Sequence, residues 1–126
     1  MTVPSPSVEL LVVDGNADLA ESVQLLLQTC GWVVHVAPDA ATALTIVERR
    51  PIALAFIAIA LPDLDGYTLA RRLRDTGPPC VLIALTGYGH AEDRRRALEA
   101  GFDDHVLKPA SLAQLEAVVT RYVRSP

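Results

Sequence analysis

The sequence predicts one α/β domain built on a doubly wound parallel sheet, and three observations lead to this prediction. Five short apolar segments alternate along the chain with five segments of amphipathic helical pattern. The connections between them are short, which favours right-handed crossovers between parallel strands. The chain has 126 residues, of which 51% are hydrophobic and 21% charged, a composition typical of one globular domain.

The expected strands are the apolar runs that end at turn residues. They cover residues 8–13, 32–36, 54–59, 80–85 and 105–107. The third run is apolar on both faces, which is typical of a strand covered by helices on each side.

Capping signals predict the helices between these strands. Asn16 is the expected N-cap of the first helix and Gly31 its stop. Asp65 is the expected N-cap of the third helix, and Ser111 with Gln114 forms a capping-box pattern at the start of the fifth. The inward face of that last helix is expected to hold Leu112, Leu115, Val118, Val119 and Tyr122.

Charge and hydropathy exclude two classes of protein. Eleven Lys and Arg against fifteen Asp and Glu give a net charge of −4, which argues against a nucleic-acid-binding surface. The arginines of residues 71–74 and 94–96 are interpreted as solvated helix faces. The longest apolar run, residues 52–61, has ten residues, whereas a membrane-spanning helix needs about 20, so no membrane insertion is expected.

The ends of the chain and its cysteines indicate an intracellular domain. Residues 1–7 are rich in Pro and Ser and lack the pattern of a signal peptide, so we expect a disordered tail followed by a single domain over residues 8–124. Cys30 and Cys80 have no metal-binding or redox spacing and are expected to be buried thiols in a reducing cytoplasm.

Candidate functional residues follow the expected strands at their carboxyl ends, where doubly wound sheets bind ligands. They are Asp14 with Gly15, Ala58, Thr86 and Lys108. The Thr86 hydroxyl and the Lys108 ammonium suit the oxygens of an anion. Asp14 suits an ion pair with Lys108 or a weak share in a cation site, because one carboxylate is a poor magnesium site. Ala58 is neither a nucleophile nor a ligand.

Four motifs occur in order: LVVDGN at residues 11–16, ALPDLDGY at 60–67, ALTG at 84–87 and LKP at 107–109. On these motifs the chain resembles the receiver domains of two-component response regulators, especially the receivers of hybrid sensor kinases, over residues 9–123. The resemblance implies a flavodoxin-like sheet with strand order 2-1-3-4-5. It also implies a cis peptide bond between Lys108 and Pro109.

The resemblance assigns a role to each candidate position. In the family, a phosphoryl group passes from a kinase histidine to an aspartate four residues before the Pro of the third loop, and that position is Ala58 here. The family's acidic pair, which positions Mg²⁺, corresponds to Asp14 and Gly15. Its switch threonine corresponds to Thr86, its phosphate-binding lysine to Lys108, and its aromatic switch position to His105.

Two of the three positions that are acidic in the family therefore have no acidic side chain here, so we expect a degenerate pseudo-receiver that lacks the phosphoacceptor. It would be a non-enzymatic signalling module with no cofactor and with lost or weak Mg²⁺ binding. It would act by contacts with a histidine kinase, a phosphotransfer protein or another receiver. We expect it in the cytoplasm as a monomer or weak dimer.

Other interpretations stay open at this point. The chain could be an ordinary phospho-accepting receiver in which Ala has replaced the acceptor Asp, or a sensor in which Thr86 and Lys108 bind a small anion. Asp14 or Asp63 could substitute as acceptor, although Asp63 is interpreted as a solvated turn residue. His35, His90 and His105 share no metal-ligand spacing and are interpreted as strand or surface residues.

Overall fold

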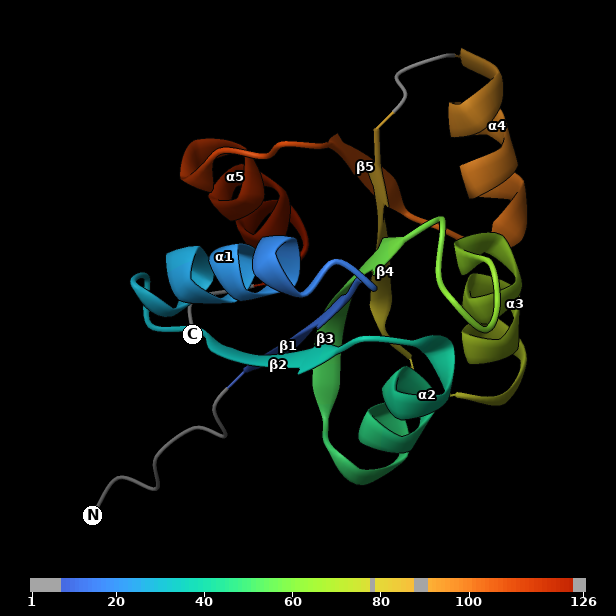
Figure 1. Ribbon diagram of the computed structural model, residues 1–126, viewed down its shortest axis with the longest axis horizontal. Coiled ribbons are helices and arrows are strands. Elements are labelled where there is room, and N and C mark those ends of the chain that lie inside the picture. Colours follow the sequence, from blue (N-terminus) through green and yellow to red (C-terminus); the bar gives the residue numbers. More distant parts are fainter. Residues whose placement is uncertain (1–7, 78, 88–90, 124–126) are drawn as a thin grey trace.

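The computed structural model describes residues 8–77, 79–87 and 91–123, which form alternating strands and helices (Figure 1). The strands are β1 (Glu9–Val13), β2 (Val33–Ala37), β3 (Ile52–Ala58), β4 (Val81–Thr86) and β5 (Asp104–Leu107). The helices are α1 (Ala17–Gln28), α2 (Ala40–Arg49), α3 (Gly66–Thr76), α4 (Ala91–Ala100) and α5 (Leu112–Tyr122). Within the described residues this is the element order that the sequence predicts.

The strands form one parallel sheet in the order β2-β1-β3-β4-β5, which confirms the doubly wound, flavodoxin-like prediction. Helices α1 and α5 cover one face, and α2, α3 and α4 cover the other (Figure 1). Neighbouring residues of a strand point to opposite faces, so β1 contributes Leu10 and Val12 to one core and Leu11 and Val13 to the other. All four of these side chains are fully buried.

Side-chain caps begin four of the helices. The Asn16 carboxamide accepts from the Leu19 N–H, and Asp39 and Asp65 cap α2 and α3 in the same way. Ser111 and Gln114 form the predicted capping box at α5. These contacts satisfy backbone N–H groups that have no partner inside the helix.

The element ends differ from the predictions by a few residues. The regular part of helix α1 ends at Gln28, and Gly31, the predicted stop, closes it with φ 92°. The Trp32 N–H donates to the Leu27 carbonyl oxygen at 3.4 Å and the Gly31 N–H to that of Gln28 at 3.0 Å, which is the glycine cap of a helix C-terminus. Strand β2 begins one residue after Trp32, which is buried. The Lys108–Pro109 peptide bond is cis, as the resemblance implies.

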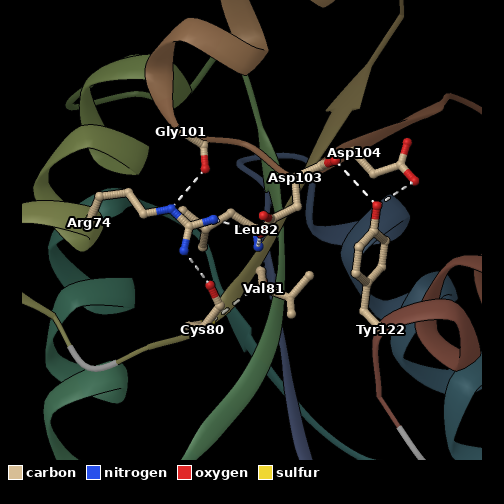
Figure 2. Close-up of polar contacts among 8 residues, drawn as sticks. All are labelled: Arg74, Cys80, Val81, Leu82, Gly101, Asp103, Asp104 and Tyr122. Carbon is tan, nitrogen blue, oxygen red and sulfur yellow. Dashed lines mark hydrogen bonds and ion pairs between the residues drawn. The ribbon is translucent and has the colours of Figure 1, made fainter.

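Two predictions of burial are wrong. Tyr122 does not face inward: it is 38% exposed, and its hydroxyl donates to Asp104 Oδ2 at 3.1 Å (Figure 2). Its place in the last turn of α5 lets the hydroxyl reach the Asp104 carboxylate and the Asp103 carbonyl oxygen. Cys80 is buried as expected, but Cys30 is only half-buried because it lies in the turn after α1.

Some predictions concern residues outside the described part of the chain. The tail over residues 1–7 and the histidine at position 90 lie there, and the extent of the domain over residues 8–124 stays a prediction. None of the helices in the described residues has both the length and the apolar character needed to cross a bilayer.

Candidate functional site

The topology brings the predicted site residues to one edge of the sheet. In the parallel register, the last residues of β1 pair with β3, and Ala58 at the end of β3 pairs with Leu85 of β4. Thr86 at the end of β4 pairs with Leu107, the residue before Lys108. Asp14, Ala58, Thr86 and Lys108 therefore all lie at the carboxyl edge, as the sequence predicts.

Asp14 and Lys108 form an ion pair at this edge. Lys108 Nζ lies 2.7 Å from Asp14 Oδ2, and the Asn16 N–H donates to Asp14 Oδ1 at 2.9 Å. The side chain of Asp14 is only 4% exposed, whereas that of Lys108 is 27% exposed. The buried carboxylate thus has a compensating charge, as such a group requires. Of the roles considered for these two residues, the structure contains the ion pair.

Ala58 ends β3 beneath the start of α3. It is 1% exposed, and the Gly66 N–H donates to the carbonyl oxygen of Ile59 at 2.7 Å. A side chain at Gly66 would collide with the Ala58 carbonyl oxygen, so only glycine allows α3 to approach β3 this closely. The position corresponding to the family's acceptor is therefore a buried methyl group.

Gly15 is different, because the backbone does not require glycine there. Its φ is not positive, and an added Cβ would lie 3.4 Å from Pro62 Cδ and 3.7 Å from the Pro38 carbonyl oxygen. These are ordinary van der Waals distances. The backbone and its neighbours would therefore accept a side chain at position 15, and nothing in the conformation requires glycine there.

The remaining side chains do not fit a magnesium ion. Asp14 is the one carboxylate left at the three acidic positions, and its Oδ2 already faces the Lys108 ammonium. Mg²⁺ in proteins takes one or two carboxylates together with phosphate oxygens and water. Within the described residues no group of three His, Cys, Asp or Glu side chains is placed to share a metal ion.

Thr86 and His105 lie on the α4 side of this edge. The Thr86 carbonyl oxygen accepts from the Lys108 backbone N–H at 2.8 Å, which joins the ends of β4 and β5. His105 borders the small spaces beneath α4 together with Arg94 and Ala97. Its Nδ1 lies 3.8 Å from Asp104 Oδ1. The structure thus pairs Asp14 with Lys108 but leaves His105 in a separate environment.

Two carboxylates in the loop after β3 are already used by helix termini. Asp63 accepts from the backbone N–H groups of Ala40 at 2.9 Å and Ala41 at 3.0 Å, so the expectation of a merely solvated turn residue is wrong. These bonds from the start of α2 hold the pKa of Asp63 below its usual value. Asp65 accepts from the Thr68 N–H and hydroxyl, as an N-cap should.

Sequence reasoning missed a buried carboxylate at the opposite edge. Glu9 begins β1 and is 4% exposed, and its Oε1 lies 2.7 Å from His35 Nε2 and 2.8 Å from Arg50 Nε. Burial raises the pKa of Glu9, but the bonds to His35 and Arg50 outweigh burial and leave this pKa below its usual value. The signal was an acidic residue that begins an otherwise apolar strand, because such a residue requires a partner.

Arg74 was also misjudged as part of a solvated arginine face. It donates to the carbonyl oxygens of Gly101 at 2.8 Å and Cys80 at 2.7 Å, and to Asp103 Oδ2 at 2.6 Å (Figure 2). Asp103 Oδ2 also accepts from the Leu82 N–H at 2.9 Å. This Arg74 clamp joins the end of α3 to the starts of β4 and β5. The pattern of charges along α3 does not reveal it.

One family model matches nearly the whole chain. Residues 10–120 match the model described as "Response regulator receiver domain". An uncharacterised 14.6 kDa protein in the sodA1 3′ region of Leptolyngbya boryana is 37% identical over 116 residues, which cover 90% of this chain and 88% of that protein.

Longer regulators and solved structures are similar as well. The two-component response regulator PhoP of Pseudomonas aeruginosa is 37% identical over 92% of this chain, but the match spans only 52% of PhoP. A chain in the co-crystal structure of the Saccharomyces cerevisiae histidine phosphotransfer protein Ypd1 with the receiver domain of Ssk1 superposes with a TM-score of 0.86 at 25% identity. That match covers 93% of this chain and 89% of the other.

Proposed function

The chain belongs to the response regulator receiver domain family, which makes it a signalling module of two-component systems, and we propose that it is a pseudo-receiver that accepts no phosphoryl group and acts by binding other proteins. The observation that carries this proposal is the methyl group of Ala58 at the position that corresponds to the acceptor. Covalent transfer needs a nucleophile, and Ala58 has none.

The charges at the carboxyl edge support the same proposal. With Gly15 and Ala58 in place of two acids, the Asp14 carboxylate and the Lys108 ammonium balance each other at 2.7 Å. Phosphoryl transfer relies on a metal ion to neutralise developing charge, and this pair offers such an ion one carboxylate. We expect lost or weak Mg²⁺ binding. The loop carboxylates Asp63 and Asp65 are bound to helix termini, which argues against either as a substitute acceptor.

The proposed partners are a histidine kinase, a phosphotransfer protein or another receiver. The Ssk1 receiver, which was solved with the phosphotransfer protein Ypd1, is a precedent for contacts of this kind. A receiver that keeps its fold also keeps the surfaces that contact such proteins, even when the changed pocket can no longer accept a phosphoryl group. We place the protein in the cytoplasm, as a monomer or weak dimer.

The test is intact-mass spectrometry after incubation with Mg²⁺ and acetyl phosphate. We expect the natural chain and Gly15→Asp, which still lacks an acceptor, to gain no mass. Ala58→Asp with Gly15→Asp should gain one phosphoryl group that hydroxylamine removes, because an aspartyl phosphate is a reactive acyl phosphate. The Gly15→Asp chain is a matched control, since its added Cβ has room.

Two outcomes would contradict the proposal. A hydroxylamine-labile adduct on the natural chain would show that another carboxylate has taken over the acceptor role. Full phosphorylation of Ala58→Asp alone would show that the pocket is otherwise intact, which favours the alternative of an ordinary receiver whose acceptor has been replaced.

A further inference from the structure

A cleft of about 520 Å³ lies beside the Asp14–Lys108 pair, between the carboxyl edge and α4. Its walls include the apolar side chains of Ile59 and Leu85 and the charged groups of Arg96 and Lys108. We propose that this cleft binds, without covalent reaction, a small molecule that carries an oxyanion group on an apolar body. Its volume lies within the range of about 300–1,000 Å³ usual for small-molecule sites.

Arg96 is the residue that points to an anion. Its guanidinium carbon lies 4.6 Å from the centre of the Tyr67 ring, and Tyr67 packs edge-on against Phe102 with ring centres 6.5 Å apart. Both rings are nine-tenths or more buried, so they hold the guanidinium at the cleft. Among the described residues no carboxylate or carbonyl accepts a hydrogen bond from Arg96, and its N–H fork suits two oxygens of one anion.

Lys108, which directly follows β5, supplies a second group of donors, on the side of the cleft away from α4. An ammonium group has three N–H donors, and in the described residues the ion-pair partner of the Lys108 ammonium is Asp14 Oδ2. Donors therefore remain for a ligand. The Asp93 carboxylate also lines the cleft and opposes an anion there. Because Asp93 offsets Arg96, and Asp14 offsets Lys108, the attraction comes from the N–H donors that Arg96 and Lys108 direct at the ligand and not from a net positive charge.

The inference rests on the proposed function, because carboxylates at positions 15 and 58 would repel an anion from this space. With Gly15 and Ala58 at these positions, two negative charges that would repel an oxyanion in the absence of a metal ion are not present. Ile59, Leu85 and the Tyr67 ring offer an apolar wall for the rest of the molecule. The ligand class is therefore an oxyanion, phosphate ester or carboxylate, attached to a small apolar group.

The test is an NMR titration of the full chain with phenyl phosphate, benzoate, inorganic phosphate and the neutral benzyl alcohol. We expect saturable shifts of the Thr86, Gly87 and Lys108 amides with phenyl phosphate, benzoate or both, and the tighter of these two ligands identifies the oxyanion. Inorganic phosphate should bind more weakly, because it cannot use the apolar wall. No saturable shift with phenyl phosphate or benzoate, or equal affinity for benzyl alcohol or inorganic phosphate, would overturn the inference.

A pair of variants locates the site. Arg96→Gln should weaken binding about tenfold, since it removes charged hydrogen bonds. Arg95→Gln changes the same charge one residue away, on a side chain that is 68% exposed and does not line the cleft, and should change affinity by less than about twofold. Equal affinity in the natural chain and Arg96→Gln would overturn the site.

The outcome is separable from that of the phosphorylation test, because the titration detects reversible binding of compounds added without a phosphodonor. An adduct with acetyl phosphate would remove the proposed function. Failure of the titration, with the natural chain still free of adduct, would remove only this inference.

Discussion

The polar clusters at the two ends of the parallel strands differ in how many polar groups they join. At the amino ends of β4 and β5, the Arg74 clamp satisfies two backbone carbonyls and a carboxylate (Figure 2). At the carboxyl ends, Asp14 and Lys108 form an ion pair, and Gly15 and Ala58 contribute no polar side-chain atom. One cluster supports the backbone, whereas the other occupies the place where ligands bind in such sheets.

This difference indicates that the residues that support the fold are not the residues at the place where ligands bind. Removing the Arg74 clamp would take a charged donor from two backbone carbonyls and a carboxylate, which we expect to destabilise the protein. Gly15 and Ala58 have no polar side-chain group that could be left without a partner. Under the proposed function, a receiver can therefore lose its reaction and retain its fold. Substitutions at the two ends of the strands test this division, from the largest expected effect to the smallest.

Gly66 is the position near the carboxyl ends of the strands where we expect a substitution to cost the most stability. Gly66→Ala should lower the free energy of unfolding by about 3 kcal/mol, because its methyl group would collide with the Ala58 carbonyl oxygen and lie 2.9 Å from Ile59 Cα. Gly15→Ala, where space exists, should change it by less than about 0.5 kcal/mol. Urea denaturation of both variants measures this. Similar losses at the two glycines would contradict the close approach of α3 to β3.

Arg74→Leu tests the amino edge. We expect a loss of about 2–3 kcal/mol, because the carbonyls of Cys80 and Gly101 and the carboxylate of Asp103 would all lose a charged donor. Arg72→Leu is the matched control, since this nearby arginine is exposed and should be nearly neutral. Equal effects of the two changes in urea denaturation would mean that the clamp contributes nothing to stability.

The Asp14–Lys108 pair sharpens the comparison through a double-mutant cycle. Lys108→Met should destabilise by about 1–2 kcal/mol, because it leaves the buried Asp14 carboxylate without its cation. The double change Lys108→Met with Asp14→Asn should recover most of this loss, to within about 1 kcal/mol of the natural chain. If the double variant is less stable than either single one, the pair is part of the framework and the division between the edges fails.

The smallest effect is a dependence on pH at Asp63. Because its pKa is lowered in the folded state by bonds from Ala40 and Ala41, the stability it adds is present above its unfolded-state pKa of about 3.9 and is lost as the pH falls through the lowered folded-state value. Asp63→Asn should therefore be less stable than the natural chain at neutral pH, and the gap should shrink in acid. Urea denaturation across this pH range measures the gap, and a gap independent of pH would contradict the prediction.

Local signals predicted most of the fold but only part of the site. The N-caps Asn16 and Asp65 and the capping box of Ser111 and Gln114 act within a few residues, so they are readable from the sequence. Asp63 was misread because its partners belong to α2, more than 20 residues away. Tyr122 was misread because spacing alone does not distinguish an inward ring from one whose hydroxyl reaches Asp104.

By itself, the sequence determined the alternation of strands and helices, the parallel sheet and the absence of acidic side chains at Gly15 and Ala58. Hydrophobic periodicity, caps and residue identity are local properties, and they need no knowledge of what packs against what. Only the tertiary structure decided that Lys108 faces Asp14, that Arg74 joins α3 to β4 and β5, and that Arg96 lies over Tyr67 at an open cleft. Each of these contacts joins elements far apart in the chain, so its existence depends on the packed sheet and helices.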